Sequence, residues 1–217
     1  MLRRDYLVRM IEEMTEVLGK VFMLRQNKKL TEALWSLDEL YKRQFRLNAR
    51  LLDTLSAKDI VKLFHSGGEL EADKLQSLAR LLKEEGDICL AMQEEEEAGA
   101  RWMKALHLYL ATGLHGADRS LWNWPDAVSE LQALLKSYRL PPETELLLMK
   151  LEESEGRYDQ AENALYRLLA EESISKEEAD AFYQRLLTLS PEQLEEGGLP
   201  LEEVREGLLE LEKRFYI

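Results

Sequence analysis

GRYDQAENAL, residues 156 to 165, is the stretch of this 217-residue chain that best indicates its fold. It follows a helical pattern that ends near Gly156, and it opens another that runs over about 159–171. Ala161 stands five residues after the glycine. A small side chain at that position allows two helices to approach closely. The stretch therefore predicts the turn of a helical hairpin.

Two other places have the same spacing, with an alanine that follows a polar turn. They are Lys28 to Ala33 and Gln93 to Ala98, and each alanine is followed by apolar residues at four and seven positions. This is the pattern of a second helix that packs on a first. Coincidence in a chain rich in Ala, Leu and Glu is the alternative explanation.

These segments resemble tetratricopeptide-type repeats. In the middle unit Gly86 corresponds to the glycine of the first helix, Ala98 to the small residue of the second helix and Trp102 to its aromatic residue. Glu85 departs from the pattern, because it stands where a leucine is usual. The resemblance implies an all-α fold of stacked antiparallel helical hairpins, an α-α superhelix, in which Gly86 and Ala98 lie close together.

The other units match less well. The unit around Ala161 keeps that alanine and Leu165 at the aromatic position, and the unit around Ala33 keeps little beyond its alanine. The three alanines are 65 and 63 residues apart, close to twice the period of about 34 residues. The intervening units must therefore have lost the pattern.

The whole chain also resembles an uncharacterised bacterial family of helical proteins. The segments that carry this resemblance are Arg3 to Glu12, RRDYLVRMIE, and Lys104 to Leu110, KALHLYL. The resemblance brings no established activity with it.

The composition is that of an all-helical protein, with 45% apolar and 33% charged residues but only 11 Gly and 5 Pro. Apolar periodicity predicts about ten helices, one of them over about 30–52, and no strand. Ser175 with Glu178 and Ser190 with Gln193 have the spacing of capping boxes, which predicts a helix start at each serine. We expect a single helical-repeat-like domain over 1–217. Its expected parts are a basic N-terminal hairpin over 1–55, central hairpins over 56–125 with an irregular loop over 113–125, and C-terminal helices over 126–217.

The net charge of −13 is unevenly distributed. Residues 1–50 carry 11 Lys and Arg against 7 Asp and Glu, a charge of +4, whereas residues 51–217 carry 18 against 35, a charge of −17. Because nucleic acid attracts basic proteins, we expect no nucleic-acid partner. One interpretation is that these charges belong to solvated helix faces. The other is that the basic hairpin faces an acidic surface, which belongs to the same chain, to a second copy or to a partner protein.

A cytoplasmic location is expected. Cys89 is the only cysteine, so no disulfide forms within the chain and a reducing compartment is indicated. The first residues are too highly charged for a signal peptide, and no apolar run is long enough to span a bilayer. We expect no membrane partner.

Residue patterns of catalysis and cofactor binding are not found in the sequence. It contains no glycine-rich phosphate loop, and His65, His107 and His115 lack the spacing of metal ligands. We therefore expect no cofactor, no metal and no catalytic residues. Catalytic groups that meet only in space stay an alternative.

An aromatic cluster is the most informative candidate site. Trp102, Tyr109, Trp122 and Trp124 lie within 23 residues, beside the loop 113–125. Tyrosine and tryptophan concentrate binding energy at interfaces, so these four residues are the predicted binding residues. The alternative is that they anchor the loop to the helices.

The function predicted from these features is that of a non-enzymatic protein interaction module. A concave helical surface would hold a segment of a protein or peptide partner, and the acidic charge would select a basic segment. The alternatives are a regulatory receptor for a small peptide or metabolite and, less favoured, an enzyme on a helical scaffold. A homodimer is also expected, because Leu2, Tyr6 and Met23 spread apolar surface around the first helix.

Overall fold

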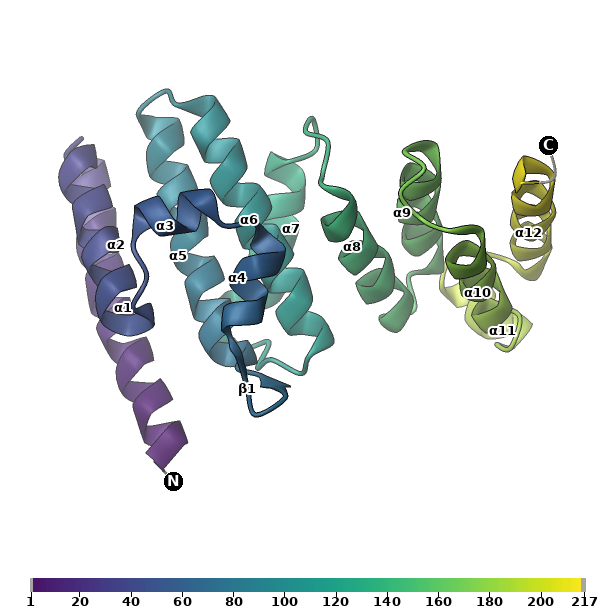
Figure 1. Cartoon of the computed structure of the whole chain (residues 1–217), viewed down its shortest axis with the longest axis horizontal. Coiled ribbons are helices and arrows are strands. Elements are labelled where there is room, and N and C mark those ends of the chain that lie inside the picture. The colour runs from purple at the N-terminus through teal and green to yellow at the C-terminus, as the bar shows by residue number, and fades with distance from the viewer. Residues whose placement is uncertain (1, 216–217) are drawn as a thin grey trace. The chain divides into compact units, whose positions relative to one another are not determined.

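The computed structural model describes residues 2–215, with side chains described from residue 5 onward (Figure 1). Over these residues it contains twelve α-helices, ten of them with seven residues or more, so the chain is all-α as predicted. The side chain of Leu2, expected to contribute to self-association, lies outside the described residues. Two compact units are distinguished, unit 1 up to Arg139 and unit 2 from Leu140. The single continuous domain stays a prediction.

The elements of unit 1 are α1 (Leu2–Gln26), α2 (Leu30–Phe45), α3 (Ala49–Thr54), α4 (Ala57–Leu63), β1 (His65–Ser66), β2 (Glu69–Leu70), α5 (Ala72–Ala91), α6 (Glu95–Leu114), the short 3₁₀ helix η1 (Leu121–Asn123) and α7 (Trp124–Leu134). Those of unit 2 are α8 (Pro142–Ser154), α9 (Tyr158–Ala170), α10 (Lys176–Leu186), α11 (Pro191–Glu196) and α12 (Leu201–Phe215).

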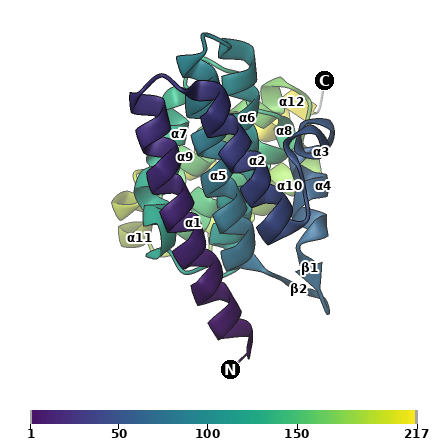
Figure 2. The same cartoon turned by 90° about the vertical axis from the view of Figure 1, so that its left-hand side faces the viewer.

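Unit 1 is built on the α5–α6 hairpin. α1 and α2 form an antiparallel pair that lies against α5, and Figure 2 shows the two helices side by side in front of it. α4 and α7 both pack on α6. Because α5 has neighbours on several sides, most of its residues from Leu75 to Cys89 are buried, including charged ones.

Gly86 and Ala98 lie close together, as expected. A Cβ atom added to Gly86 would stand 2.6 Å from two ring atoms of Trp102 and 3.2 Å from the carbonyl oxygen of Ala98. Only a glycine leaves room for this ring between α5 and α6. The hairpin predicted around residue 93 is therefore present.

The stretch at 156–165 is also a hairpin turn. α8 ends at Ser154, Gly156 adopts a left-handed conformation with φ of 75°, and α9 begins at Tyr158. Ala161 is fully buried against the neighbouring helix, which is the reason for its small side chain.

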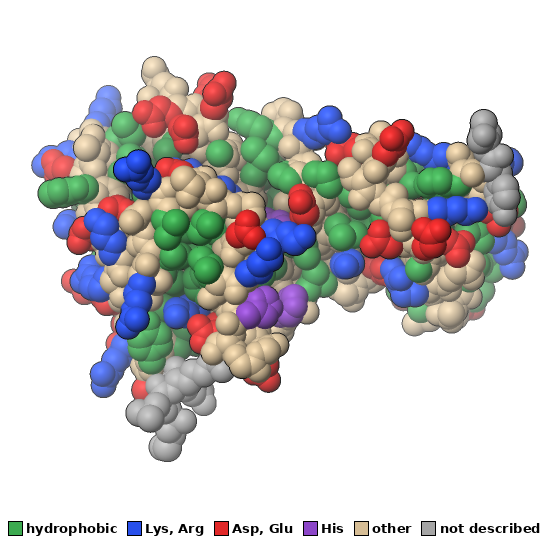
Figure 3. Space-filling view, viewed as in Figure 1, with side chains coloured by type: hydrophobic (Ala, Val, Ile, Leu, Met, Phe, Trp, Pro, Cys, Tyr) green, Lys and Arg blue, Asp and Glu red, His purple; other side chains and the backbone are tan. Residues whose placement is uncertain are grey.

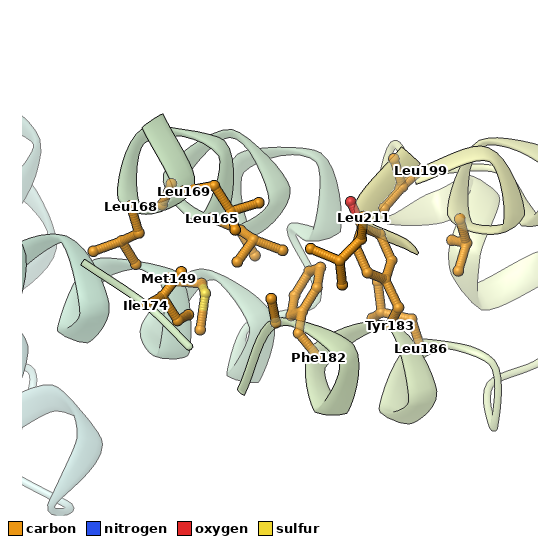
Figure 4. Packing of buried hydrophobic residues seen from close by; sticks show 14 of the residues in the cluster. Met149, Leu165, Leu168, Leu169, Ile174, Phe182, Tyr183, Leu186, Leu199 and Leu211 are labelled. Carbon is orange, nitrogen blue, oxygen red and sulfur yellow. The ribbon is translucent and has the colours of Figure 1, made fainter. Parts of the chain in front are cut away.

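Unit 2 has its own hydrophobic core, drawn in Figure 4. It combines side chains from α8 to α12, among them Met149, Leu165, Phe182, Tyr183 and Leu211. Ser175 and Ser190 each form a complete capping box that starts α10 and α11, as their spacing predicts.

Two local predictions are wrong. The helix expected over about 30–52 ends at Phe45, because Arg46 is left-handed and the Asn48 side chain caps a new helix by accepting a bond from Leu51 N. No strand was expected, yet β1 and β2 form a short antiparallel hairpin around Gly67 and Gly68. Both glycines have positive φ, which suits a tight hairpin turn.

Candidate interaction surfaces

The four predicted binding residues lie inside unit 1 or along its surface rather than around an open hollow. Trp102, Tyr109 and Trp124 are buried, with at most 4% of each residue exposed, and Trp122 is half-buried. The three indole N–H groups donate to nearby acceptors, whereas the buried Tyr109 hydroxyl has no hydrogen-bond partner among the described residues. Trp102 Nε1 donates to Asp87, Trp124 Nε1 to the carbonyl oxygen of Tyr109, and Trp122 Nε1 to Ser77 Oγ.

This geometry favours the anchoring interpretation of the cluster. Trp122 and Trp124 flank the end of the connection between α6 and α7, and their indole bonds tie it to α5 and α6. Gln76 also donates to the carbonyl oxygens of Asp118 and Leu121. A binding role for the four aromatic residues stays a prediction.

A buried ionic group replaces the leucine of the repeat pattern at position 85. The Tyr41 hydroxyl donates to Glu85 at 2.7 Å, and Arg101 Nε lies 3.0 Å from the same carboxylate. Arg101 also pairs with Asp53. Burial and the Glu85 charge raise the pKa of Tyr41, so its hydroxyl keeps its proton. The group links α2, α5 and α6 as a structural network.

Nucleophilic and metal chemistry find little support in the described part of the chain. Burial raises the pKa of the Cys89 thiol to about 11, which leaves it protonated and unreactive at neutral pH. Within residues 5–215 no group of three or more His, Cys, Asp or Glu side chains is placed to hold a metal ion. His65 and His115 are exposed and His107 is buried.

The first groove lies in unit 1, between the N-terminal half of α1 and the start of α5, and has a volume of about 740 Å³. Leu7, Val8 and Ile11 form its apolar wall. Its polar groups are engaged with each other, because Lys74 pairs with Glu71 and Asp73 accepts a bond from the Asp118 backbone.

The second groove lies in unit 2, between α9 and α12, and has a volume of about 370 Å³. Tyr166 and Leu169 line it from α9, Tyr183 of α10 forms its floor, and α12 contributes Gly207, Glu210, Leu211, Lys213 and Arg214. Gly207 is required there, since an added Cβ would lie 2.5 Å from the Tyr183 hydroxyl. In Figure 4 the ring of Tyr183 and the side chain of Leu211 lie next to each other.

Glu210 lines this second groove, and two further carboxylates, Glu162 and Glu203, lie near it. The Tyr183 hydroxyl donates to Glu162 at 2.8 Å, and the Tyr166 hydroxyl donates to Glu210 at 3.3 Å. Burial raises the pKa of Glu162, the charges of Glu203 and Glu210 raise it further, and the Tyr183 bond opposes this effect in part. We call Glu162, Glu203 and Glu210 the carboxylate cluster.

Unit 2 as a whole is strongly acidic. It carries 8 Lys and Arg against 20 Asp and Glu, a formal charge of −12, whereas unit 1 carries 21 against 22, a charge of −1. Figure 3 shows acidic and basic side chains interspersed on the face of unit 2 turned to the viewer. Nearly all of the net charge of the protein therefore belongs to unit 2.

Sequence reasoning missed this groove. Tyr183 has the spacing of a core residue, and Tyr166, Gly207 and Glu210 lie on two helices whose pairing the apolar pattern does not specify. The usable signals were a glycine in the interior of a helix, at position 207, and the carboxylates at 203 and 210, which lie seven residues apart on one side of that helix.

Residues 1–216 match the model of a family of unknown function (DUF6483), so the chain belongs to that family. No curated protein and no solved structure matches the chain. Among the helices described, none is both long enough and apolar enough to cross a bilayer.

Proposed function

We propose that this member of the DUF6483 family is a non-enzymatic interaction module that binds a basic segment of a protein partner in the α9–α12 groove. The observation that carries the proposal is the carboxylate cluster beside an apolar groove, in a unit with a charge of −12. A bound Arg or Lys would place its aliphatic part against Tyr166 and Leu211 and its charge at the cluster.

Several cations of unit 2 are engaged in pairs outside the groove lining, whereas Lys213 and Arg214 line the groove. Arg167 pairs with Glu145 at 2.9 Å, and Arg185 forms a two-pronged pair with Glu153 at 2.6 and 2.8 Å. Arg157 pairs with Glu152, and Arg214 donates to the Leu169 carbonyl oxygen at 2.6 Å.

The packing of the helical hairpins also supports the proposal of an interaction module. The α5–α6 and α8–α9 hairpins have the close small-residue packing of tetratricopeptide-type repeats, a class of scaffold that presents surfaces to peptides. This relationship is part of the proposal, as are the cytoplasmic location and the bacterial origin that the sequence suggests. A second copy of the chain, the other expected partner, concerns a different surface on α1.

The test is the binding of a short fluorescent peptide of alternating Arg and Leu, followed by anisotropy. The double variant Glu203→Gln, Glu210→Gln is expected to weaken binding by about tenfold or more, since charge-assisted contacts contribute about 1.5–3 kcal/mol each. A matched variant, Glu195→Gln, Glu196→Gln, removes the same charge from α11, outside the groove lining. It should retain most of the affinity.

Equal losses in the two variants would show that binding follows net charge alone, and the groove assignment would then be wrong. A peptide of alternating Glu and Leu controls for apolar binding. Failure of the Arg peptide to bind the wild-type protein would reject the proposal and leave the receptor and enzyme alternatives.

A further inference from the structure

One edge of α1, whose N-terminal part borders the first groove, carries a stripe of uncharged side chains that stays largely exposed. Val8, Ile11, Thr15, Gly19 and Phe22 recur at intervals of three and four residues, which places them on one side of the helix. Val8 is 48% exposed and Phe22 is 55% exposed. Thr15 and Gly19 are exposed, and Ile11 is half-buried. We call these five residues the α1 edge.

A different side of α1 packs within unit 1. Met10, Met14, Leu18 and Val21 are buried, and the helix contacts α2 and α5. In the view of Figure 2, α2 lies beside α1 on one side of it. The fold of unit 1 therefore buries one apolar side of the helix and leaves Val8 and Phe22 exposed on the α1 edge. Exposed apolar side chains that line up on one side of a helix are a feature of interaction sites.

Gly19 has no role within the fold of unit 1. It lies in the interior of a 25-residue helix, where glycine is less favourable than alanine. A Cβ atom added to it would meet no atom within 4 Å. Close approach of another backbone is a physical reason for glycine at an exposed helical position. The contrast is with Gly86 and Gly207, which are both required by rings of the same chain.

We infer that the α1 edge packs against the α1 edge of a second copy of this chain, with the two helices antiparallel about a two-fold axis near Thr15. In this arrangement Ile11 lies opposite Gly19 of the second copy, and Val8 lies opposite Phe22. A bulky side chain thus enters the space above each glycine. The same stripe serves both copies, as a two-fold interface requires.

The charge of unit 1 suits a second copy. Its formal charge is −1, so two copies approach without a large net repulsion, whereas the charge of −12 on unit 2 opposes pairing through that unit. In the antiparallel arrangement Lys20 of one copy lies opposite position 10 of the other. Its offset from Glu12 along the helix axis is therefore two residues, roughly 3 Å, so the two opposite charges attract. The two Glu16 side chains approach each other near the axis, which is a local cost.

The size of the interface sets the expected strength. A helix of 25 residues is about 37 Å long, and two such helices packed along their edges bury on the order of 1,000 Å² in total, which is near the lower limit for specific interfaces. The dimer is therefore expected to be weak and to dissociate on dilution.

Sedimentation velocity over a range of protein concentrations tests the inference. The wild-type protein is expected to pass from monomer to dimer as the concentration rises. Phe22→Glu should abolish the dimer while the circular dichroism spectrum and melting curve stay close to wild type, because Phe22 is exposed. Trp35→Glu is the matched control, since Trp35 is 75% exposed on α2, outside the α1 edge, and it should dimerise like the wild type.

Gly19→Ala distinguishes a role of Gly19 in dimerisation from a role in the fold of the monomer. The added methyl group is expected to raise the melting temperature of the monomer, because alanine favours the helix, and to weaken dimerisation at least tenfold, because it holds the two backbones apart. Glu16→Gln is expected to strengthen the dimer. Thr15→Cys should form a disulfide-linked dimer on oxidation, whereas Val8→Cys should not.

Three results would overturn the inference. They are a wild-type protein that stays monomeric at the highest concentration, a dimer that Trp35→Glu disrupts while Phe22→Glu does not, and a dimer that Gly19→Ala leaves unchanged. Cross-linking of Val8→Cys in place of Thr15→Cys would reject the antiparallel arrangement.

Discussion

At the scale of single residues, the two glycines at 86 and 19 stand in opposite situations. Gly86 faces the Trp102 ring, with room for no further atom, whereas the surroundings of Gly19 are empty to 4 Å. The two residues are both in helix interiors. Any difference between their alanine variants therefore reports packing rather than helix propensity.

Gly86→Ala is expected to destabilise the protein by about 1–3 kcal/mol, because the new methyl group must displace the Trp102 ring from between α5 and α6. The displaced indole would also lose its bond to Asp87. Urea unfolding followed by tryptophan fluorescence measures the effect. Gly19→Ala is the control, measured at a concentration where the protein is monomeric, and it should stabilise by up to about 1 kcal/mol. Equal effects of the two changes would show that the ring contact is unimportant.

At the scale of elements, Tyr183 of α10 and the Tyr166–Glu210 hydrogen bond join α9 to α12, whereas the carboxylate cluster places like charges on both helices. Like charges between two helices lower stability when they are ionised. The native pKa of Glu162 is raised above its ordinary value of 4.5, so the folded protein binds a proton there more tightly than the unfolded chain. Protonation of Glu162 therefore raises the free energy of unfolding as the pH falls through the native pKa.

Glu162→Gln is therefore expected to stabilise unit 2 at neutral pH, where the wild-type carboxylate is ionised. The amide oxygen can still accept the Tyr183 hydrogen bond. The advantage should shrink as the pH falls through the native pKa toward 4.5, because the wild-type carboxyl group takes up its proton over that interval. Thermal unfolding at several pH values measures it. Glu195→Gln, which removes a charge from α11, serves as the control, and a pH-independent difference for Glu162→Gln would contradict the expectation.

At the scale of the whole molecule, the net charge and the tryptophan residues are distributed unequally between the two units. Unit 2 has 78 residues and a charge of −12, whereas unit 1 has 139 residues and a charge of −1. All four tryptophans, at positions 35, 102, 122 and 124, belong to unit 1. Tryptophan fluorescence therefore reports unit 1, and circular dichroism reports the helices of both units.

We expect unit 2 to unfold first on heating at low salt, because it is the smaller unit and its charges repel one another. The circular dichroism transition should then begin below the tryptophan transition. Added sodium chloride screens the repulsion and should bring the two transitions together. Coincident transitions at every salt concentration would show that the two units unfold as one and that the charge imbalance has little effect.

Most of the local structure was predictable from the sequence. Apolar periodicity located the helices, and the capping boxes at Ser175 and Ser190 located two of their starts, because these signals act between residues a few positions apart. The end of α2 was missed because periodicity continues past Arg46, whose left-handed conformation breaks the helix.

The candidate sites were less predictable. Three of the four aromatic residues chosen from the sequence are buried, and the α9–α12 groove was not identified. Burial depends on which helices become neighbours, and a side chain with an apolar surface and a polar end suits a core as well as a binding surface.

The sequence by itself determined that the chain is all-α, where most helices begin, and that a glycine and an alanine at 86 and 98 would meet across a hairpin, because periodicity, caps and small-residue spacing are short-range properties. Only the tertiary structure decided that Glu85 joins a buried ionic group, that Gly207 packs against the Tyr183 side chain and that no atom lies within 4 Å of a Cβ added to Gly19. Those outcomes depend on distances between residues far apart in the chain, and no local pattern encodes such distances.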